Sequence, residues 1–200
     1  MIRRNLILIA AVALAISACT GDRIINNSDP RPETPIAVTT APATTPISNV
    51  HLVNAFHYVA HVGEMTGYYF TTPSGKWRCA ILSHIKAGCQ VSSSSQSGLG
   101  IEGAPESVPD AAGQDTAPNA IVVGREGDPQ FVALDQPEFW LDPGPAKALQ
   151  FNRILAAAGF RCNVQEESGV SCLSETSGKG FTFSAEGYTP QYTDVPAGAP

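Results

Sequence analysis

Four cysteines in the second part of the chain could do thiol chemistry, and they form two pairs of identical spacing. Nine residues separate Cys79 from Cys89, and nine separate Cys162 from Cys172. Cysteine thiols form disulfides or, as thiolates, hold zinc. Structural zinc sites usually contain knuckles in which about two to four residues separate the cysteines. The spacing therefore favours disulfides, for which four cysteines allow three pairings.

The residues around the two cysteine pairs repeat as well. Each first cysteine follows an aromatic residue and an arginine, in Trp77-Arg78-Cys79 and in Phe160-Arg161-Cys162, and a glycine (Gly88 or Gly169) lies shortly before each second cysteine. This agreement predicts an internal duplication. It favours pairing within each copy, because opposed residues in the two strands of a hairpin have Cβ atoms near bridging distance. The expected disulfides are Cys79–Cys89 and Cys162–Cys172.

Two histidines have a spacing that can serve metal binding. His57 and His61 are four residues apart and would share a face if their segment were helical, and Glu64 could act as a third ligand. The glutamate of the zinc-protease motif is absent between them. A partly exposed histidine pair is the alternative interpretation, and we assign no metal and no cofactor.

Hydroxyl nucleophiles give only weak patterns. Ser83 and Lys86 have the Ser-x-x-Lys spacing of penicillin-interacting serine enzymes, but that motif must open a helix in a much larger domain. Here it lies inside the first cysteine loop. Neither a Gly-x-Ser-x-Gly elbow nor a phosphate-binding loop is present. The sequence therefore predicts no catalytic residues, although distant residues such as His84 and Ser74 with an acid could assemble a site.

The segments that carry the cysteines have the composition of strands, because they are rich in aromatic and β-branched residues and are bounded by turn residues. The expected strands are 68–72, 76–82, 88–91, 119–123, 130–134, 159–164, 170–173 and 180–184. In the last of these, Phe181 and Phe183 alternate with polar residues, as in a half-buried strand. The predicted fold is mainly β, a small antiparallel sandwich or barrel-like domain built on two disulfide-bridged hairpins, with little helix.

Three other segments are less regular. Residues 51–65 show a weak helical spacing of apolar side chains, and residues 151–158 fit a helix or a strand equally well. The stretch 92–118 is rich in Ser, Gly and Pro and is expected to be loop.

The N-terminus has the three parts of a secretory signal peptide. Arg3 and Arg4 precede an apolar run over residues 6–16, and two small residues, Ser17 and Ala18, follow it. The run is about a dozen residues long, whereas a membrane-spanning helix needs roughly 20. We expect residues 1–18 to be removed, residues 19–49 to form a disordered Thr/Pro linker, residues 50–193 to form one domain, and residues 194–200 to be a flexible tail.

The end of this signal resembles the lipobox of bacterial lipoproteins. Ile16-Ser17-Ala18-Cys19 is the matching motif. The resemblance implies that a lipid is attached to the thiol of Cys19 and that cleavage then makes this cysteine the first residue. Two or more acyl chains anchor a protein stably. The expected location is therefore the extracytoplasmic face of the cell membrane.

The charge of the chain excludes one class of partner. Removal of residues 1–18 takes away two arginines and no acid, and so lowers the formal charge from −6 to −8. An acidic protein without a basic cluster is a poor candidate for nucleic acid. Between residues 102 and 142, nine acidic residues stand against one base, Arg125. A solvated surface is one interpretation and a cationic-ligand site the other, but no dense calcium loop is present.

Two parts of the domain resemble a family of small exported actinobacterial domains whose function is unknown. The first is Phe70-Thr71-Thr72-Pro73-Ser74-Gly75, followed by Cys79; the second is Gly169-Val170-Ser171-Cys172, followed by Thr176-Ser177-Gly178-Lys179-Gly180-Phe181 and Tyr188. With the lipobox and the linker, the chain resembles a mycobacterial-type lipoprotein. The resemblance implies a compact β fold and a place in the cell envelope, and it brings no catalytic residues.

The expected function is a non-enzymatic module of the cell envelope that binds a small ligand or an envelope protein. A small envelope hydrolase and a metal-handling lipoprotein are the alternatives.

Overall fold

The computed structural model describes residues 49–91, 98–142, 144 and 146–200. These residues all belong to one compact unit. The signal peptide, Cys19 and most of the linker lie outside the described residues, so the interpretations that concern them stay predictions. Among the described residues the regular structure is almost wholly strand, and the helix it contains is the three-residue 3-10 helix η1, Ala55–His57.

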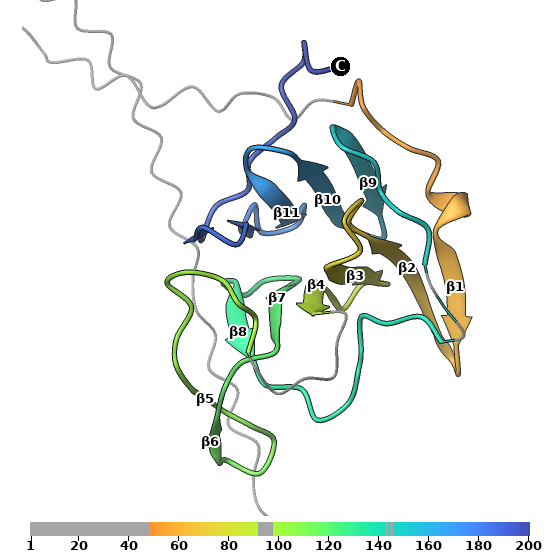
Figure 1. Ribbon diagram of the computed structural model, residues 1–200. Coiled ribbons are helices and arrows are strands. Elements are labelled where there is room, and N and C mark those ends of the chain that lie inside the picture. Colours follow the sequence, from red (N-terminus) through yellow and green to blue (C-terminus); the bar gives the residue numbers. More distant parts are fainter. Residues whose placement is uncertain (1–48, 92–97, 143, 145) are drawn as a thin grey trace, which may run out of the picture. The chain divides into compact units, whose positions relative to one another are not determined.

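The first sheet has six strands in the order β1-β2-β3-β4-β7-β8, each antiparallel to its neighbours (Figure 1). Its strands are β1 (Val59–Val62), β2 (Met65–Thr71), β3 (Trp77–Leu82), β4 (Lys86–Val91), β7 (Ala120–Gly124) and β8 (Gln130–Val132).

The second sheet has five strands in the order β13-β12-β11-β10-β9, again antiparallel throughout. Its strands are β9 (Arg153–Ala157), β10 (Phe160–Gln165), β11 (Gly169–Ser174), β12 (Gly180–Phe183) and β13 (Tyr188–Thr189). A separate small hairpin of β5 (Val108–Pro109) and β6 (Asp115–Thr116) lies between β4 and β7 in the chain.

The duplication extends beyond the two hairpins from which it was predicted. β2, β3, β4, β7 and β8 follow one another as an antiparallel meander, and β9 to β13 do the same. In each meander a disulfide joins the second strand to the third, Cys79–Cys89 in the first sheet and Cys162–Cys172 in the second. The two cysteines of each pair are opposed in register, so the predicted pairing is confirmed.

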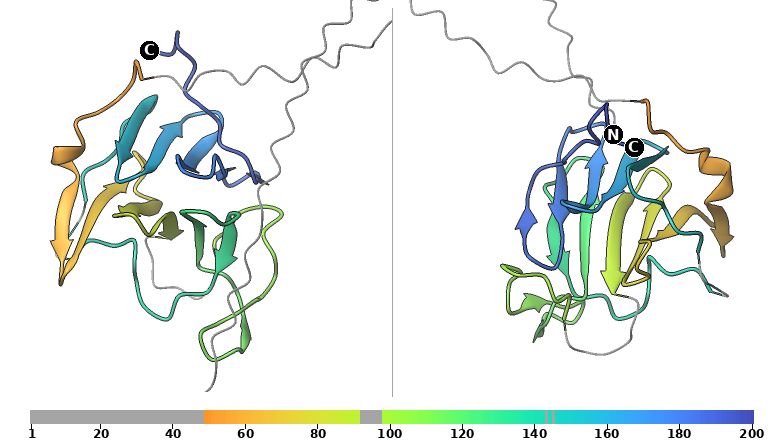
Figure 2. Two further views of the ribbon diagram at one scale, coloured as in Figure 1. Left: turned by 180° about the vertical axis from the view of Figure 1, so that it is seen from behind. Right: turned by 45° about the horizontal axis from the view of Figure 1, so that its top comes forward.

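The two sheets share one apolar core between their facing sides (Figure 1, Figure 2). Successive strand residues point to opposite faces, and the inward set includes all four paired cysteines, which have no exposed surface. Trp77 of β3 meets Phe183 of β12 edge to face, with the ring centroids 4.9 Å apart. Phe131 of β8 meets Tyr188 of β13 in the same way at 4.8 Å. The domain is thus an antiparallel sandwich with little helix, as predicted.

The long connection from β8 to β9 covers the outer face of the first sheet. Phe139 of this connection is buried in a second, smaller core with Tyr69, Ala80 and Leu82. Gly88 on β4 lacks the side chain that would collide with it, since a Cβ atom there would lie 2.5 Å from Cζ of Phe139. The connection therefore lies directly on the sheet.

The C-terminal segment covers the outer face of the second sheet with polar contacts. Asn163 on β10 is fully buried and donates to Oη of Tyr192 and to the carbonyl oxygen of Thr193, each at 2.9 Å. The hydroxyl of Thr182 on β12 donates to the carbonyl oxygen of Gln191 at 2.7 Å. This cover explains why every residue of β12 is buried, whereas the alternation in its sequence predicted a half-buried strand.

The weakly helical spacing in residues 51–65 gives mostly non-helical structure. Three residues there form η1, and the rest of the regular structure is β1 and the start of β2, which pair with each other from Val59 opposite Tyr68. A short helix in isolation is marginal in water, so pairing at a sheet edge decides the outcome. For the same reason the stretch 151–158 contains a strand and no helix: its residues 153–157 are β9, which pairs along β10.

Both ends of the described chain pack onto the second sheet. Val53 N–H donates to the carbonyl oxygen of Ile154, and Ile154 N–H donates to that of His51, so the N-terminal segment covers the open edge of β9. Within the tail that was predicted to be flexible, Val195 is buried, and the His51 ring donates from Nε2 to the carbonyl oxygen of Pro196 at 3.2 Å.

Candidate functional site

The paired cysteines have a structural role. Each disulfide lies in the core between the sheets, without contact with solvent. A buried disulfide sulfur cannot act as a nucleophile or as a thiolate ligand. The described cysteines therefore hold the two hairpins and contribute no reactive group.

The histidines do not form the helical pair that a metal site would need. His57 ends η1, whereas His61 lies in β1 with its Nδ1 3.0 Å from Oγ1 of Thr66. Glu64 follows in the turn after β1. In the described part of the chain, no group of three or more His, Cys, Asp or Glu residues is placed to hold a metal ion.

The structure also separates the residues named for a hydrolase. Ser74 lies in the turn before β3, and its Oγ is 3.1 Å from Oγ1 of Thr72. His84 lies in the turn after β3. A strand of six residues spans about 17 Å, so these two side chains cannot act on one substrate atom. Lys86, from the Ser-x-x-Lys spacing, forms an ion pair with Glu138.

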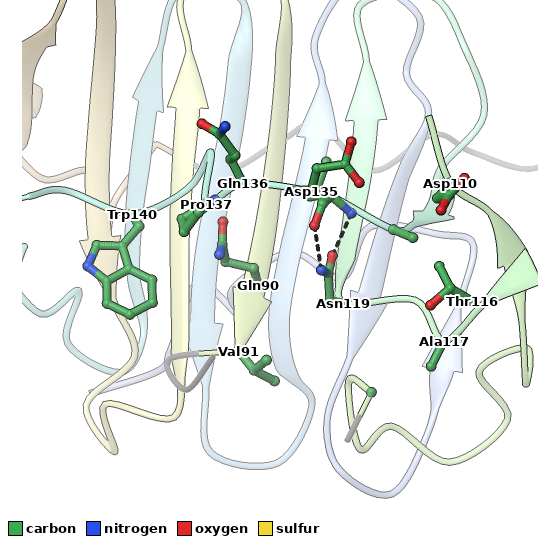
Figure 3. A pocket seen from close by; sticks show the side chains of 13 residues that line it. Gln90, Val91, Asp110, Thr116, Ala117, Asn119, Asp135, Gln136, Pro137 and Trp140 are labelled. Carbon is green, nitrogen blue, oxygen red and sulfur yellow. Dashed lines mark hydrogen bonds between the residues drawn. The ribbon is translucent and has the colours of Figure 1, made fainter. Parts of the chain in front are cut away.

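A pocket of about 370 Å³ lies where the ends of β4 and β7 meet the β5–β6 hairpin and the connection that follows β8 (Figure 3). This volume is within the range of about 300–1,000 Å³ that is usual for small-molecule sites. Its lining is mostly polar and includes Gln90, Asp110, Asn119, Asp135 and Trp140.

Two carboxamide side chains hold the wall that follows β8. Asn119 donates from Nδ2 to the carbonyl oxygen of Leu134 and accepts from the Leu134 N–H, both at 2.8 Å (Figure 3). Gln90 accepts with Oε1 from the N–H groups of Glu138 at 3.0 Å and Phe139 at 2.8 Å. Because each amide binds backbone groups, the wall from Leu134 to Phe139 is fixed against the first sheet.

The opposite wall is the β5–β6 hairpin. Oδ1 of Asp110 accepts from the N–H groups of Ala112 at 2.9 Å and Gln114 at 2.8 Å, which holds the turn of this hairpin. Thr116 at the end of β6 also lines the pocket. The side chain of Asp110 thus stabilises the turn of the hairpin, and the same carboxyl group lines the pocket.

Trp140 supplies the aromatic surface of the pocket, and an arginine holds it. The guanidinium carbon of Arg78 lies 3.6 Å from the centroid of the Trp140 ring. Arg78 is not among the residues that line the pocket. The lining has two carboxylates, Asp110 and Asp135, and no lysine or arginine among the described residues, so the local potential is negative.

Sequence reasoning did not find this site. Its polar residues come from β4, the β5–β6 hairpin, the start of β7 and the segment after β8, and no motif links them. The one signal was the acidic stretch 102–142, which contains Asp110, Asp135 and Trp140. Most of the acidic residues in this stretch are exposed, Asp135 among them, whereas Asp110 is half-buried at the pocket.

Comparison with known proteins gives no family or function for the chain. No protein-family model matches it, and no curated protein and no solved structure shows significant similarity to it. Among the described residues, the only helix is too short to cross a membrane.

Proposed function

We propose that this chain is a lipid-anchored protein of the cell envelope, of the actinobacterial type that its motifs resemble, and that its β domain binds a small ligand or a partner protein without catalysing a reaction. The signal-like N-terminus and the lipobox-like Cys19 support the location. The two disulfides fit it as well, because disulfides persist in oxidising compartments outside the cytoplasm.

The pocket beside Trp140 is the observation that supports a binding role. It has fixed walls, since Asn119 and Gln90 bind the backbone of the segment that encloses it. A preformed pocket binds with little loss of conformational entropy on the protein side. Among the described lining residues the ionisable side chains are Asp110 and Asp135, with no histidine, cysteine or lysine beside them, and we take this as support for binding over catalysis.

The lipid anchor can be tested at one atom. Substitution Cys19→Ala removes the thiol that would carry the lipid, and we expect the variant to leave the membrane fraction and to lose metabolic labelling with a fatty acid. The matched control is Ser28→Ala in the linker, which should behave as wild type. Persistent labelling of Cys19→Ala would contradict the assignment.

The binding role can be tested with the tethered protein as bait in intact cells. Proximity labelling by wild type is compared with labelling by Ala117→Trp, which fills the pocket at an exposed lining position, and by Ala185→Trp, which adds the same bulk at an exposed position away from it. We expect a set of labelled molecules that Ala117→Trp loses and Ala185→Trp keeps. Identical sets for all three proteins would overturn the pocket as the binding site, and turnover of a captured molecule would overturn the non-enzymatic assignment.

A further inference from the structure

The two carboxamide side chains that line the pocket differ in how many of their hydrogen bonds are made within the described residues. The carboxamide of Asn119 is satisfied on both sides by Leu134. The carboxamide of Gln90 is satisfied only at Oε1, where it accepts two backbone N–H groups. Its Nε2 has no hydrogen-bond partner among the described residues, although the residue is only 8% exposed. Figure 3 shows this nitrogen on the side of the amide that faces Trp140.

Two carboxylate acceptors line the same pocket. Asp135 forms no hydrogen bond with the described residues, so within this part of the chain neither of its carboxylate oxygens has a partner. Asp110 uses only Oδ1 for the turn of its hairpin, which leaves Oδ2. An amide donor and two carboxylates thus line one cavity; Gln90 is buried, Asp110 half-buried and Asp135 exposed, and unpaired polar groups in such a cavity favour a ligand that can hydrogen-bond to them.

Three classes of ligand fit this lining poorly. An anion would meet two carboxylates and no basic group. An apolar ligand would leave the amide of Gln90 and the carboxylates without partners. A cation could pair with the carboxylates but could accept no hydrogen bond from Nε2 of Gln90, and the guanidinium group of Arg78, 3.6 Å from the centroid of the Trp140 ring, already occupies one π face of that ring.

A neutral polyhydroxylated ligand satisfies every one of these groups. A hydroxyl group both donates and accepts, so it can give a hydrogen bond to Asp135 or Asp110 and receive one from Nε2 of Gln90. The C–H groups of a sugar ring are apolar and can pack on the indole of Trp140. We propose that this pocket binds a neutral saccharide, with Gln90 as donor, Asp135 and Asp110 as acceptors and Trp140 as the stacking surface. This inference rests on the proposed binding function and names its ligand class.

The test uses a printed array of neutral, cationic and anionic glycans, followed by titration of the purified domain with the strongest hit. The readout in titration is the indole N–H signal of Trp140 in NMR spectra. The chain has two tryptophans, so the other indole signal, that of Trp77, is the internal reference. We expect neutral glycans to bind, and the Trp140 signal to shift while the signal of Trp77, in the core, does not.

Two variants separate the proposed contacts from a general loss of structure. Gln90→Glu keeps an acceptor for the N–H groups of Glu138 and Phe139 but replaces the Nε2 donor with an oxygen, so it should preserve the wall and weaken binding at least tenfold. Asp135→Asn changes an exposed residue and should weaken binding by a similar factor. The matched control is Glu126→Gln, at an exposed position outside the pocket, which should bind as wild type.

Three results would overturn the saccharide assignment. The first is the absence of any neutral glycan bound more strongly by wild type than by Ala117→Trp. The second is preferred binding of cationic glycans that Asp135→Asn abolishes and Gln90→Glu strengthens, which would make the site a cation site. The third is binding that leaves the Trp140 signal unmoved. If labelling in cells still depends on an open pocket, each of these results would reject the ligand class and leave the binding function standing.

Discussion

At the scale of the residue, a missing side chain at Gly88 and a buried hydroxyl at Tyr192 control how the outer faces are covered. Gly88 lets the ring of Phe139 lie on β4, and the same connection then forms the wall that carries Asp135 and Trp140. Tyr192 accepts from Asn163 and donates to Asp194 at 3.2 Å, and so holds the C-terminal segment on the second sheet.

Substitution Gly88→Ala should destabilise the domain and loosen the pocket. The added Cβ would lie 2.5 Å from Cζ of Phe139 and 2.7 Å from the carbonyl oxygen of Ile121. Overpacking of this kind costs about 1–3 kcal/mol, which urea denaturation can measure. The matched control is Gly124→Ala on β7, where a Cβ meets nothing within 4 Å. Equal stability of the two variants would contradict the packing of Phe139 described above.

The stability of the domain should fall at high pH, partly through Tyr192. Burial raises the pKa of Tyr192 well above the value of a free phenol, with the charge of Asp194 acting in the same direction. The native state therefore keeps a proton that the unfolded state loses above about pH 10. The stabilising contribution is full below that pH and declines above it, by up to about 1.4 kcal/mol per pH unit for one group. Urea denaturation from pH 8 to pH 11 should show that the free energy of unfolding declines more steeply for wild type than for Tyr192→Phe. Parallel declines in the two proteins would contradict a role of Tyr192 in the pH dependence.

At the scale of the element, the two disulfide-bridged hairpins are equivalent. Each bridge joins opposed residues of neighbouring strands and closes a loop of the same length, with a sequence separation of 10. Each also lies between the second and third strands of its meander. The β5–β6 hairpin, in contrast, belongs to the first half, since it has no counterpart between β9 and β13.

Removal of either disulfide should therefore cost a similar amount of stability. Closing a loop of 11 residues contributes about 2.8 kcal/mol in the chain-entropy model. We expect the pair Cys79→Ala/Cys89→Ala and the pair Cys162→Ala/Cys172→Ala each to lower the free energy of unfolding by about this amount, plus a cost for the lost sulfur atoms in the core. Each pair is the control for the other. Peptide mapping under non-reducing conditions checks the remaining bridge, and a mixed bridge between the halves would contradict the structure.

The sequence could predict the elements that follow from local patterns, but not those that depend on contacts between distant segments. The strands and both disulfides follow from local patterns, because aromatic and β-branched runs and the repeat around Cys79 and Cys162 are visible in the chain itself. β1 was not predicted because it is a strand through its pairing with β2, whereas the spacing of its own apolar residues is weakly helical. The pocket was missed because Gln90, Asp110 and Asp135 come together only through the pairing of β4 with β7 and the folding back of the connection after β8.

At the scale of the whole molecule, the domain is closed by its own ends. The N-terminal segment covers the edge of β9, and Arg161 on β10 donates to Oδ1 of Asn49 at 2.9 Å. The C-terminal segment buries Asn163 and Thr182, which would otherwise face water. The two ends also meet each other through His51 and Pro196.

A chain that ends at Pro190 should fold but be clearly less stable. It loses the hydrogen bonds that Asn163, Gln165 and Thr182 make with the C-terminal segment. At about 1 kcal/mol each, these bonds amount to roughly 3 kcal/mol. The matched control ends at Val195, keeps these bonds and should lose much less. Urea denaturation and amide hydrogen exchange of β10 and β12 measure the difference, and equal stability of the two truncated chains would show that the segment is not part of the fold.

The position of both ends has a steric consequence for access to the pocket. The segment before η1 and the C-terminus lie at one end of the β domain, and the β5–β6 hairpin, which forms a wall of the pocket, lies at the other (Figure 1, Figure 2). A tether, a fusion partner or a sensor surface that joins the domain at either of these ends therefore holds it from the end remote from the β5–β6 hairpin (Figure 1, Figure 2). A ligand longer than the cavity that extends past this hairpin would run away from the attachment point.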